Sequence, residues 1–283
     1  MRAVRIGLAL IICALVIGGC DEMRDRRPPP EPPTMLNDIA WDVDERLGYT
    51  VYVQESGEYV PYLVLTNDFN GSRNVLLLRQ YLLDDRRAYR YLNEVWQFDV
   101  DVVAAYYGDS DIDAFLNSEF YEKLCSVTRD SIIDSSIEIT AMESIGIGGR
   151  NTININRKIF LLSWIEVNGN VGRRVSRIHV PEGTELEYFS ERGLRIAYHS
   201  NGEAGNWWLR TPNNAESNVV AGVDRTGMAA SAPINVIGGL THPHGTERLA
   251  GVRPAMCLPR DTPIRESTLN GDSVFKLDIA NNS

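Results

Sequence analysis

The chain has 283 residues, of which 43% are hydrophobic and 23% charged, a balance typical of a folded globular protein with a sizeable core. Its formal net charge is −10, from 28 basic and 38 acidic side chains. This excess of acid argues against nucleic-acid binding, because phosphates require a basic face, and against adsorption to anionic lipid by charge alone.

The first nineteen residues have the pattern of an export signal. Arg2 and Arg5 form a basic start, an apolar run covers residues 6–17, and two glycines precede Cys20. The run is shorter than the about 20 apolar residues that a membrane-spanning helix requires. We therefore expect residues 1–19 to be a signal peptide.

Residues 16–20 resemble the bacterial lipobox, in which small residues precede a cysteine that receives diacylglycerol and becomes the mature N-terminus. The pattern departs at Ile17, where the lipobox prefers leucine. The resemblance implies that Cys20 is lipidated, and each buried methylene of a lipid adds about 0.8 kcal/mol to membrane attachment. An ordinary secretory signal or an uncleaved anchor is the alternative.

Proline dominates the segment that follows the anchor. Residues 20–34 are predicted to be an extended spacer, because proline fixes its own backbone and biases the residue before it. A disordered leader is the alternative. The globular domain is expected over residues 35–260, and residues 261–283 form a C-terminal tail with room for one extra strand.

The first elements of the domain read as strands. Residues 50–54 and 60–65 are predicted to pair around a turn at residues 55–58. Residues 74–83 are strongly apolar and are interpreted as a buried strand, although periodicity alone leaves a helix open.

The clearest helix is predicted over residues 111–124. Its apolar stripe consists of Ile112, Phe115, Leu116, Phe120 and Leu124. Ser110 precedes the stripe and Asp113 follows three residues later, close to a capping box.

Later segments add mainly strands. These are residues 132–140, a buried segment at 158–167 that ends at a turn at 168–170, and strands at 206–212, 219–223 and 251–259. Helix early and strands late predict an α+β fold: a single domain with mainly antiparallel strands and one or two main helices.

Several of these segments form a pattern seen elsewhere. They are residues 62–65, 113–121 and 158–167 and, most specifically, 207–212 and 251–255. In this order they resemble domain-of-unknown-function family 6273 of exported bacterial proteins, over roughly residues 47–259. The resemblance implies an exported domain of undetermined activity and supplies no catalytic residue.

A second resemblance concerns architecture. A tryptophan-rich strand, a glycine-rich excursion and a last strand with an arginine are similar to bacterial relatives of the C-type lectin-like fold. In that fold a disulfide commonly joins the first helix to the last strand, which implies a bond between Cys125 and Cys257. Two separate buried thiols are the alternative. Relatives that modify sulfatases use a late pair of cysteines, which Cys257 alone does not reproduce.

An aspartate series opens the main helix. Asp109, Asp111 and Asp113 have the first spacings of a calcium loop. Ala114 and Phe120 stand where that loop requires glycine and glutamate, so the acids are interpreted as charges that favour a helix N-terminus.

Other chemical motifs are weak. His242 and His244 flank a proline and are interpreted as surface loop residues rather than metal ligands. The glycine cluster at 146–149 precedes no predicted helix and is expected to be a loop rather than a phosphate site. We expect no metal and no cofactor.

The tryptophan strand has two interpretations. Trp207 and Trp208 point to opposite sides of a strand, so one is expected in the core. The other, with Arg210, is placed to line a ligand surface, since aromatic faces stack on sugars and guanidinium groups. The structural alternative buries Arg210 beside an acid and makes Arg253 an ion-pair partner.

Together these features favour a lipid-anchored lipoprotein at the cell envelope, facing away from the cytoplasm. It would present a non-enzymatic binding or interaction domain, with a glycan, a peptide or an envelope protein as partner. A hydrolase of cell-wall material and a purely structural envelope protein are the alternatives.

The lipid anchor is tested by a single substitution. Cys20→Ser should release the protein from membranes into the soluble fraction, because no residue remains to carry the lipid. Fractionation followed by immunoblotting measures this. Unchanged membrane retention of the variant would contradict the anchor.

Overall fold

The computed structural model describes residues 32–41, 50–91, 105–169, 179–235, 237–238 and 249–279. The predicted signal peptide, Cys20, most of the spacer, His242 and His244 lie outside these residues. The described elements all belong to the unit Pro33–Ser283.

The predicted first hairpin is confirmed. β1 (Thr50–Glu55) and β2 (Glu58–Thr66) pair antiparallel, with Glu55 opposite Glu58. Ser56 and Gly57 between them have positive φ values of 49° and 92°. This is the backbone of a turn whose twist matches that of the two strands.

A seven-stranded sheet has the order β15-β16-β1-β2-β3-β14-β7. β3 (Asn74–Arg79) pairs with β2 on one side and with β14 (Ala255–Pro259) on the other. Its central position explains its four consecutive buried residues and decides for the strand over the helix. β7 (Ile159–Phe160) closes this side of the sheet.

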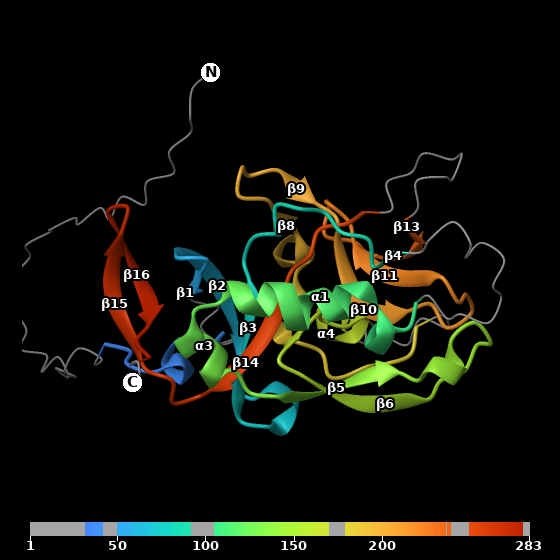
Figure 1. Cartoon of the computed structure of the whole chain (residues 1–283), viewed down its shortest axis with the longest axis horizontal. Helices are drawn as coiled ribbons and strands as arrows, with labels where there is room; N and C mark the ends of the chain where they lie inside the picture. Colours follow the sequence, from blue (N-terminus) through green and yellow to red (C-terminus); the bar gives the residue numbers. More distant parts are fainter. Residues whose placement is uncertain are drawn as a thin grey trace, which may run out of the picture. The chain divides into compact units, whose positions relative to one another are not determined.

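The C-terminal tail contributes two strands rather than one. β15 (Ile264–Leu269) and β16 (Asp272–Leu277) form a hairpin around Asn270 and Gly271, whose φ values are 53° and 94°. β16 also pairs with β1 in parallel, so this hairpin forms one end of the large sheet (Figure 1).

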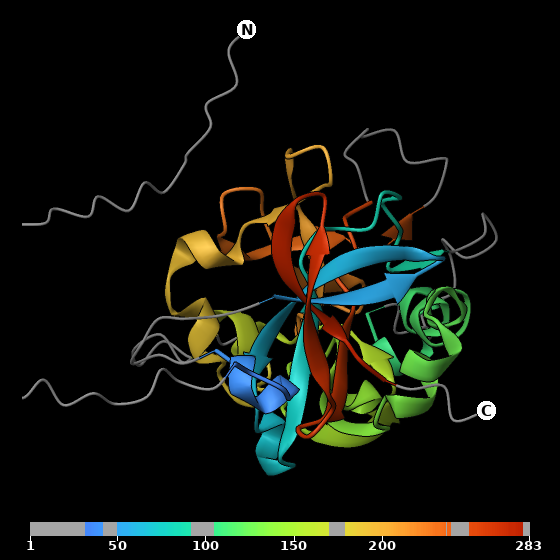
Figure 2. The same cartoon turned by 90° about the vertical axis from the view of Figure 1, so that its left-hand side faces the viewer.

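The predicted main helix is confirmed as a continuous helical segment. It consists of α1 (Asp111–Phe115), the π-helical turn η5 (Leu116–Phe120) and α2 (Tyr121–Lys123). Ser110 caps it by accepting a hydrogen bond from the Asp113 backbone at 3.2 Å. α3 (Ser126–Ser131) follows. Figure 2 shows this green segment and the gold segment of residues 187–195 on different sides of the large sheet.

Smaller sheets complete the fold. They are the hairpin β5 (Ser135–Thr140)–β6 (Thr152–Arg157), the three-stranded sheet β10 (Trp207–Pro212)–β11 (Val219–Val223)–β12 (Ala229–Asn235), and the short pairs β8 (Ala197–Tyr198)–β9 (Ala204–Gly205) and β13 (Ile237–Gly238)–β4 (Arg90–Tyr91). The short 3-10 helices are η1 (Leu36–Ile39), η2 (Phe69–Gly71), η4 (Tyr107–Asp109), η6 (Met142–Ser144), η7 (Glu187–Ser190) and η8 (Arg192–Arg195).

The buried segment predicted at 158–167 is divided between two elements. After β7 the chain turns into α4 (Trp164–Asn168), which ends at Gly169 in a positive-φ conformation. Ser163 and Glu166 form a reciprocal capping box that starts α4. The fold is therefore α+β, as predicted, with a large antiparallel-rich sheet and one main helical segment.

No helix in the described part of the chain has both the length and the apolar character needed to cross a membrane.

The side chain of Arg210 is fully buried at the centre of the fold. Its two terminal nitrogens donate to both carboxylate oxygens of Glu166, at 2.8 and 2.7 Å. Its Nε lies 3.6 Å from Glu182 and donates to the backbone oxygen of Glu138 at 3.0 Å. The carbonyl of Leu161 accepts a further bond at 2.9 Å. This fork-shaped contact joins β10 to α4 and β5.

Both acids are also held by neutral groups. Glu182 accepts bonds from the backbone and hydroxyl of Thr140 at 2.7 and 2.6 Å, and from the hydroxyl of Thr211 at 2.7 Å. Glu166 accepts the backbone N–H of Ser163 at 2.8 Å. Burial raises the pKa of Glu182, and the charge of Arg210 opposes that rise. We name these residues, with Arg210, the Arg210 network.

The implied disulfide is not formed, and both cysteines are free. The Cys125 sulfur contacts the hydroxyl of Thr128 at 3.1 Å, in the first turn of α3. Cys257 lies buried inside the large sheet, where β14 pairs with β3. Burial raises the pKa of the Cys257 thiol to about 12, so this thiol is protonated at neutral pH.

Removal of the Arg210 charge should lower the stability of the domain. Arg210→Met leaves Glu166 and Glu182 buried without their counter-charge, so the free energy of unfolding should fall by about 3–5 kcal/mol. Urea unfolding measures this loss. Arg265→Met is the control, because Arg265 and its partner Asp278 are 60% and 54% exposed. The control should lose about 0–1 kcal/mol. Equal losses in the two variants would contradict a central role for Arg210.

Candidate functional site

Of the two interpretations of the tryptophan strand, the ligand surface is wrong. Trp207, Trp208 and Arg210 are each 0% exposed. The indole nitrogen of Trp207 donates to the carbonyl of Arg195 at 3.1 Å, and that of Trp208 to the carbonyl of Arg87 at 2.8 Å. Both faces of β10 are covered by other elements, so the structural alternative describes this strand.

Arg253 is also buried, at 2% exposure, but it is not the expected ion-pair partner. Its Nε donates to the carbonyl of Arg79 at 2.9 Å, and its guanidinium lies 5.3 Å from the ring centre of Trp207. Within the described residues it forms no salt bridge, and its Nη1 makes no hydrogen bond. Burial therefore lowers its pKa to about 10.

The candidate site lies along the β5–β6 hairpin. Two hollows, of about 620 and 670 Å³, are both lined by Asp134, which immediately precedes β5. The first extends to the start of α1, and the second extends to η2 and Gly183. We name the two hollows together the hairpin groove.

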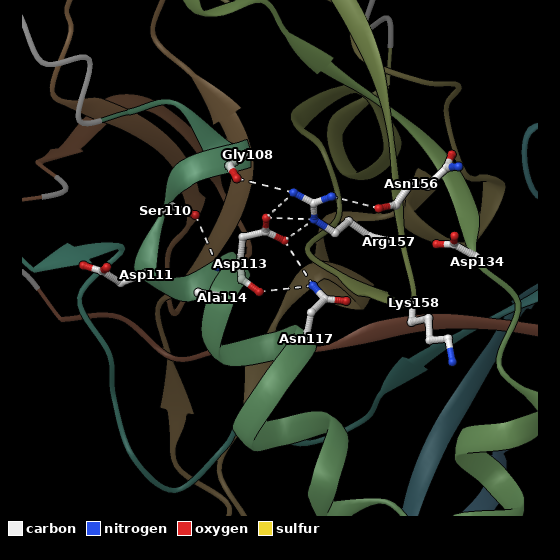
Figure 3. Close-up of a pocket in the computed structure, with 10 residues that line it drawn as sticks. All are labelled: Gly108, Ser110, Asp111, Asp113, Ala114, Asn117, Asp134, Asn156, Arg157 and Lys158. Carbon is white, nitrogen blue, oxygen red and sulfur yellow. Dashed lines mark hydrogen bonds and ion pairs between the residues drawn. The ribbon is translucent and has the colours of Figure 1, made fainter.

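A partly buried ion pair borders the α1 end of the hairpin groove. Arg157, the last residue of β6, donates from Nε to both carboxylate oxygens of Asp113 at 2.9 and 2.8 Å. Figure 3 shows the Asp113 carboxylate pointing toward the Arg157 guanidinium. Asp113 is 3% exposed, so the earlier interpretation as a helix-terminal charge is incomplete. Asp111 is exposed, and the side chain of Asp109 lies outside the described residues.

Asn117 connects the Asp113–Arg157 pair to the large sheet through hydrogen bonds. Its amide nitrogen donates to the side chain of Asp113 at 3.1 Å and to the carbonyl of Ile159 at 2.9 Å. Its amide oxygen accepts the backbone N–H of Ile159 at 3.1 Å. Asn117 lies in the π-helical turn η5, where the wider backbone turn is often associated with functional positions.

The acids of the hairpin groove do not form a general acid–base pair. Burial raises the pKa of Asp113, while hydrogen bonds from Arg157, Tyr107 and Asn117 lower it without cancelling the rise. With its oxygens occupied, Asp113 has no capacity for a substrate. Asp134 is exposed, and in Figure 3 it lies beyond the Arg157 side chain rather than opposite Asp113.

The far end of the hairpin groove is likewise built from satisfied groups. Glu138 on β5 accepts the backbone N–H of Gly183 at 2.9 Å and the hydroxyl of Thr152. The carboxylate of Asp68 accepts the backbone N–H of Arg73 at 2.8 Å. These contacts fix the loops that border the groove.

Between these two ends, the hairpin groove is lined by polar side chains that have no hydrogen-bond partner in the described part of the chain. Asn74, Asp134, Ser136, Asn154 and Asn156 line the hairpin groove, and their side chains make no hydrogen bond within the described part of the chain. The set has four neutral side chains and one carboxylate. It can donate and accept hydrogen bonds with a neutral polar ligand.

No group of three or more histidine, cysteine, aspartate and glutamate side chains among the described residues is arranged to hold a metal ion.

Sequence comparison places this hairpin inside a known family. Residues 72–260, more than half of the chain, match the family described as Domain of unknown function (DUF6273). The chain belongs to this DUF6273 family. No curated protein and no solved structure matches it. The DUF6273 region contains β3, the main helical segment, β14 and most of the hairpin groove, whose η2 border precedes residue 72.

Sequence reasoning missed the polar residues of the hairpin groove. The run Thr152–Arg157 places isoleucine and asparagine alternately, which is the two-residue period of a strand with one wet face. This signal would have identified Asn154 and Asn156 as solvent-facing. Nothing local pairs Arg157 with Asp113, which stands 44 positions earlier.

The ion pair at the groove predicts a defined pH response. Arg157→Gln removes the cation that opposes burial, so the pKa of Asp113 should rise further above 3.8. Between 3.8 and the raised value the folded state binds more protons than the unfolded state, so stability falls as pH rises. The variant should show this fall over a wider pH window.

A carbon-13 NMR titration of the Asp113 carboxyl, with urea unfolding at several pH values, measures both effects. Arg265→Gln, which changes an exposed arginine, is the control. An unchanged or lower pKa of Asp113 in Arg157→Gln would count against the assigned role of Arg157.

Proposed function

We propose that this DUF6273 protein is a lipid-anchored module of a bacterial cell envelope, and that its hairpin groove binds a neutral, hydroxyl-rich ligand of the glycan class. The attachment rests on the sequence of residues 1–20, with Cys20 as the lipidated residue and residues 20–34 as the spacer. The C-type lectin-like resemblance agrees with a glycan-binding role and remains part of the proposal.

The single observation that carries the binding role is the unused polar lining of the hairpin groove. Amide and hydroxyl side chains at 74, 136, 154 and 156 offer both donors and acceptors in an open hollow. A sugar hydroxyl also donates and accepts, so each such contact can be satisfied on both sides. Among the side chains of this lining that make no hydrogen bond within the described residues, Asp134 is the one that carries a charge.

The same geometry favours binding over hydrolysis. A glycoside hydrolase requires two carboxyl groups on opposite sides of the scissile bond. In the hairpin groove Asp113 is bonded to Arg157 and Asn117, and Glu138 is bonded to Gly183 and Thr152, so neither acid is available to act with Asp134. A purely structural role gives no account of a hollow with unused polar side chains.

Glycan binding is tested on β6. The expressed protein is screened against a glycan array, and the best glycan is titrated calorimetrically into the wild type and into Asn154→Ala and Asn156→Ala. Each variant should bind about three- to tenfold more weakly, which corresponds to one neutral hydrogen bond. Ile153→Ala is the matched control, because Ile153 is half-exposed on the opposite face of the same strand.

Three outcomes would reject this proposal. The array shows no bound glycan, the asparagine variants bind as tightly as Ile153→Ala, or envelope glycan is cleaved by the wild type and not by Asp134→Asn. The last result would favour the hydrolase.

A further inference from the structure

A second, smaller cavity lies away from the hairpin groove. Its volume is about 190 Å³, and its lining comes from the β1–β2 hairpin, the end of β3, the loop after β3 and the main helical segment. Besides Ser56, the lining consists of charged side chains and of an apolar wall formed by Val60, Leu83 and Phe115.

One ion pair in this cavity is neutralised internally. Arg79 donates from Nε to both oxygens of Glu55 at 3.0 and 3.2 Å, and from Nη1 to the carbonyls of Tyr81 and Leu82 at 2.6 and 2.8 Å. The hydroxyl of Tyr62 donates to Glu55 at 2.6 Å. The Arg79–Glu55 pair is therefore saturated with internal contacts, and a ligand would interact with the other charged side chains of the cavity.

Arg87 is held firmly but is not satisfied. Its backbone exchanges hydrogen bonds with Ala250 and its guanidinium stacks 3.5 Å from the ring centre of Phe115. One terminal nitrogen lies 3.6 Å from Glu119, whose side chain is 68% exposed. Its Nε is buried and makes no hydrogen bond. The Arg87 side chain as a whole is 32% exposed and lines the cavity, so its positive charge is accessible to an anionic ligand.

Three further charges complete the cavity lining. Lys123 on α2 and Asp85 in the loop after β3 are exposed, and their side chains make no hydrogen bond or ion pair within the described residues. Asp84 receives only a long bond from the hydroxyl of Ser200, at 3.4 Å. Lys123 and Asp85 thus provide one unpaired positive and one unpaired negative charge in one small cavity beside an apolar wall.

We propose that this cavity binds a free amino acid in its zwitterionic form. Arg87 and Lys123 receive the carboxylate, and Asp84 and Asp85 receive the ammonium group. The apolar wall receives an aliphatic side chain, and the cavity volume suits a single small molecule rather than a polymer. This site is independent of the ligand proposed for the hairpin groove.

The test compares molecules that differ in one charge. The standard free amino acids are screened against the full-length protein by thermal shift, and leucine is titrated calorimetrically beside leucinamide and N-acetylleucine. Leucine should bind, and loss of either its carboxylate or its ammonium charge should weaken binding about tenfold or more. Lys123→Met and Asp85→Asn should each weaken leucine binding by about the same factor.

Two variants serve as controls. Arg265→Met changes an exposed charge elsewhere, and Asn154→Ala changes the hairpin groove. Both should leave leucine binding unchanged, so failure of the glycan proposal is distinguishable from failure of this one. The inference is overturned if no free amino acid binds, if leucinamide and N-acetylleucine bind as tightly as leucine, or if Lys123→Met and Asp85→Asn bind leucine as the wild type does.

Discussion

The buried side chain of Arg210 links three elements of the fold that are distant in the sequence. Its guanidinium joins β10 to α4 through Glu166 and to β5 through the carbonyl of Glu138. Because β5 is held along its inner edge, the hairpin that it forms with β6 presents the opposite side to solvent. Glu138 shows the connection directly: its backbone carbonyl accepts a hydrogen bond from Arg210, and its carboxylate accepts one from Gly183 at the border of the hairpin groove.

A buried charged network contributes little net stability, because the desolvation of three ions offsets much of their attraction. Its advantage is geometric specificity, since each oxygen and each N–H has one suitable partner. Gly183 illustrates the tight fit: a Cβ added there would meet a Glu166 oxygen at 2.6 Å. The network therefore fixes the loop after Glu182 as well as the strands, whereas an apolar core of similar volume would tolerate other arrangements.

The sequence predicts the locally determined elements of this fold. The first hairpin, β3, the Ser110-capped helix and β10 follow from turn residues, periodicity and capping chemistry. The sequence does not predict contacts between distant positions. Glu166 stands 44 positions from Arg210, and no local pattern identifies Glu166 as the partner of Arg210. The two-residue period also implied one wet face for β10, but both of its faces are covered. The pairing of Asp113 with Arg157 is not predicted for the same reason. The alternation of isoleucine and asparagine on β6, by contrast, is visible in the sequence.

Because the Arg210 network joins β10, α4 and β5, it should open only when the whole domain unfolds. Native-state hydrogen exchange tests it at the amides of Thr140, which donates to Glu182, and Arg210, which donates to the carbonyl of Leu162. Both amides should exchange with the free energy of global unfolding, while the turn amide of Gly227 exchanges much faster. Exchange of Thr140 and Arg210 through a local opening far below the global free energy would contradict the account.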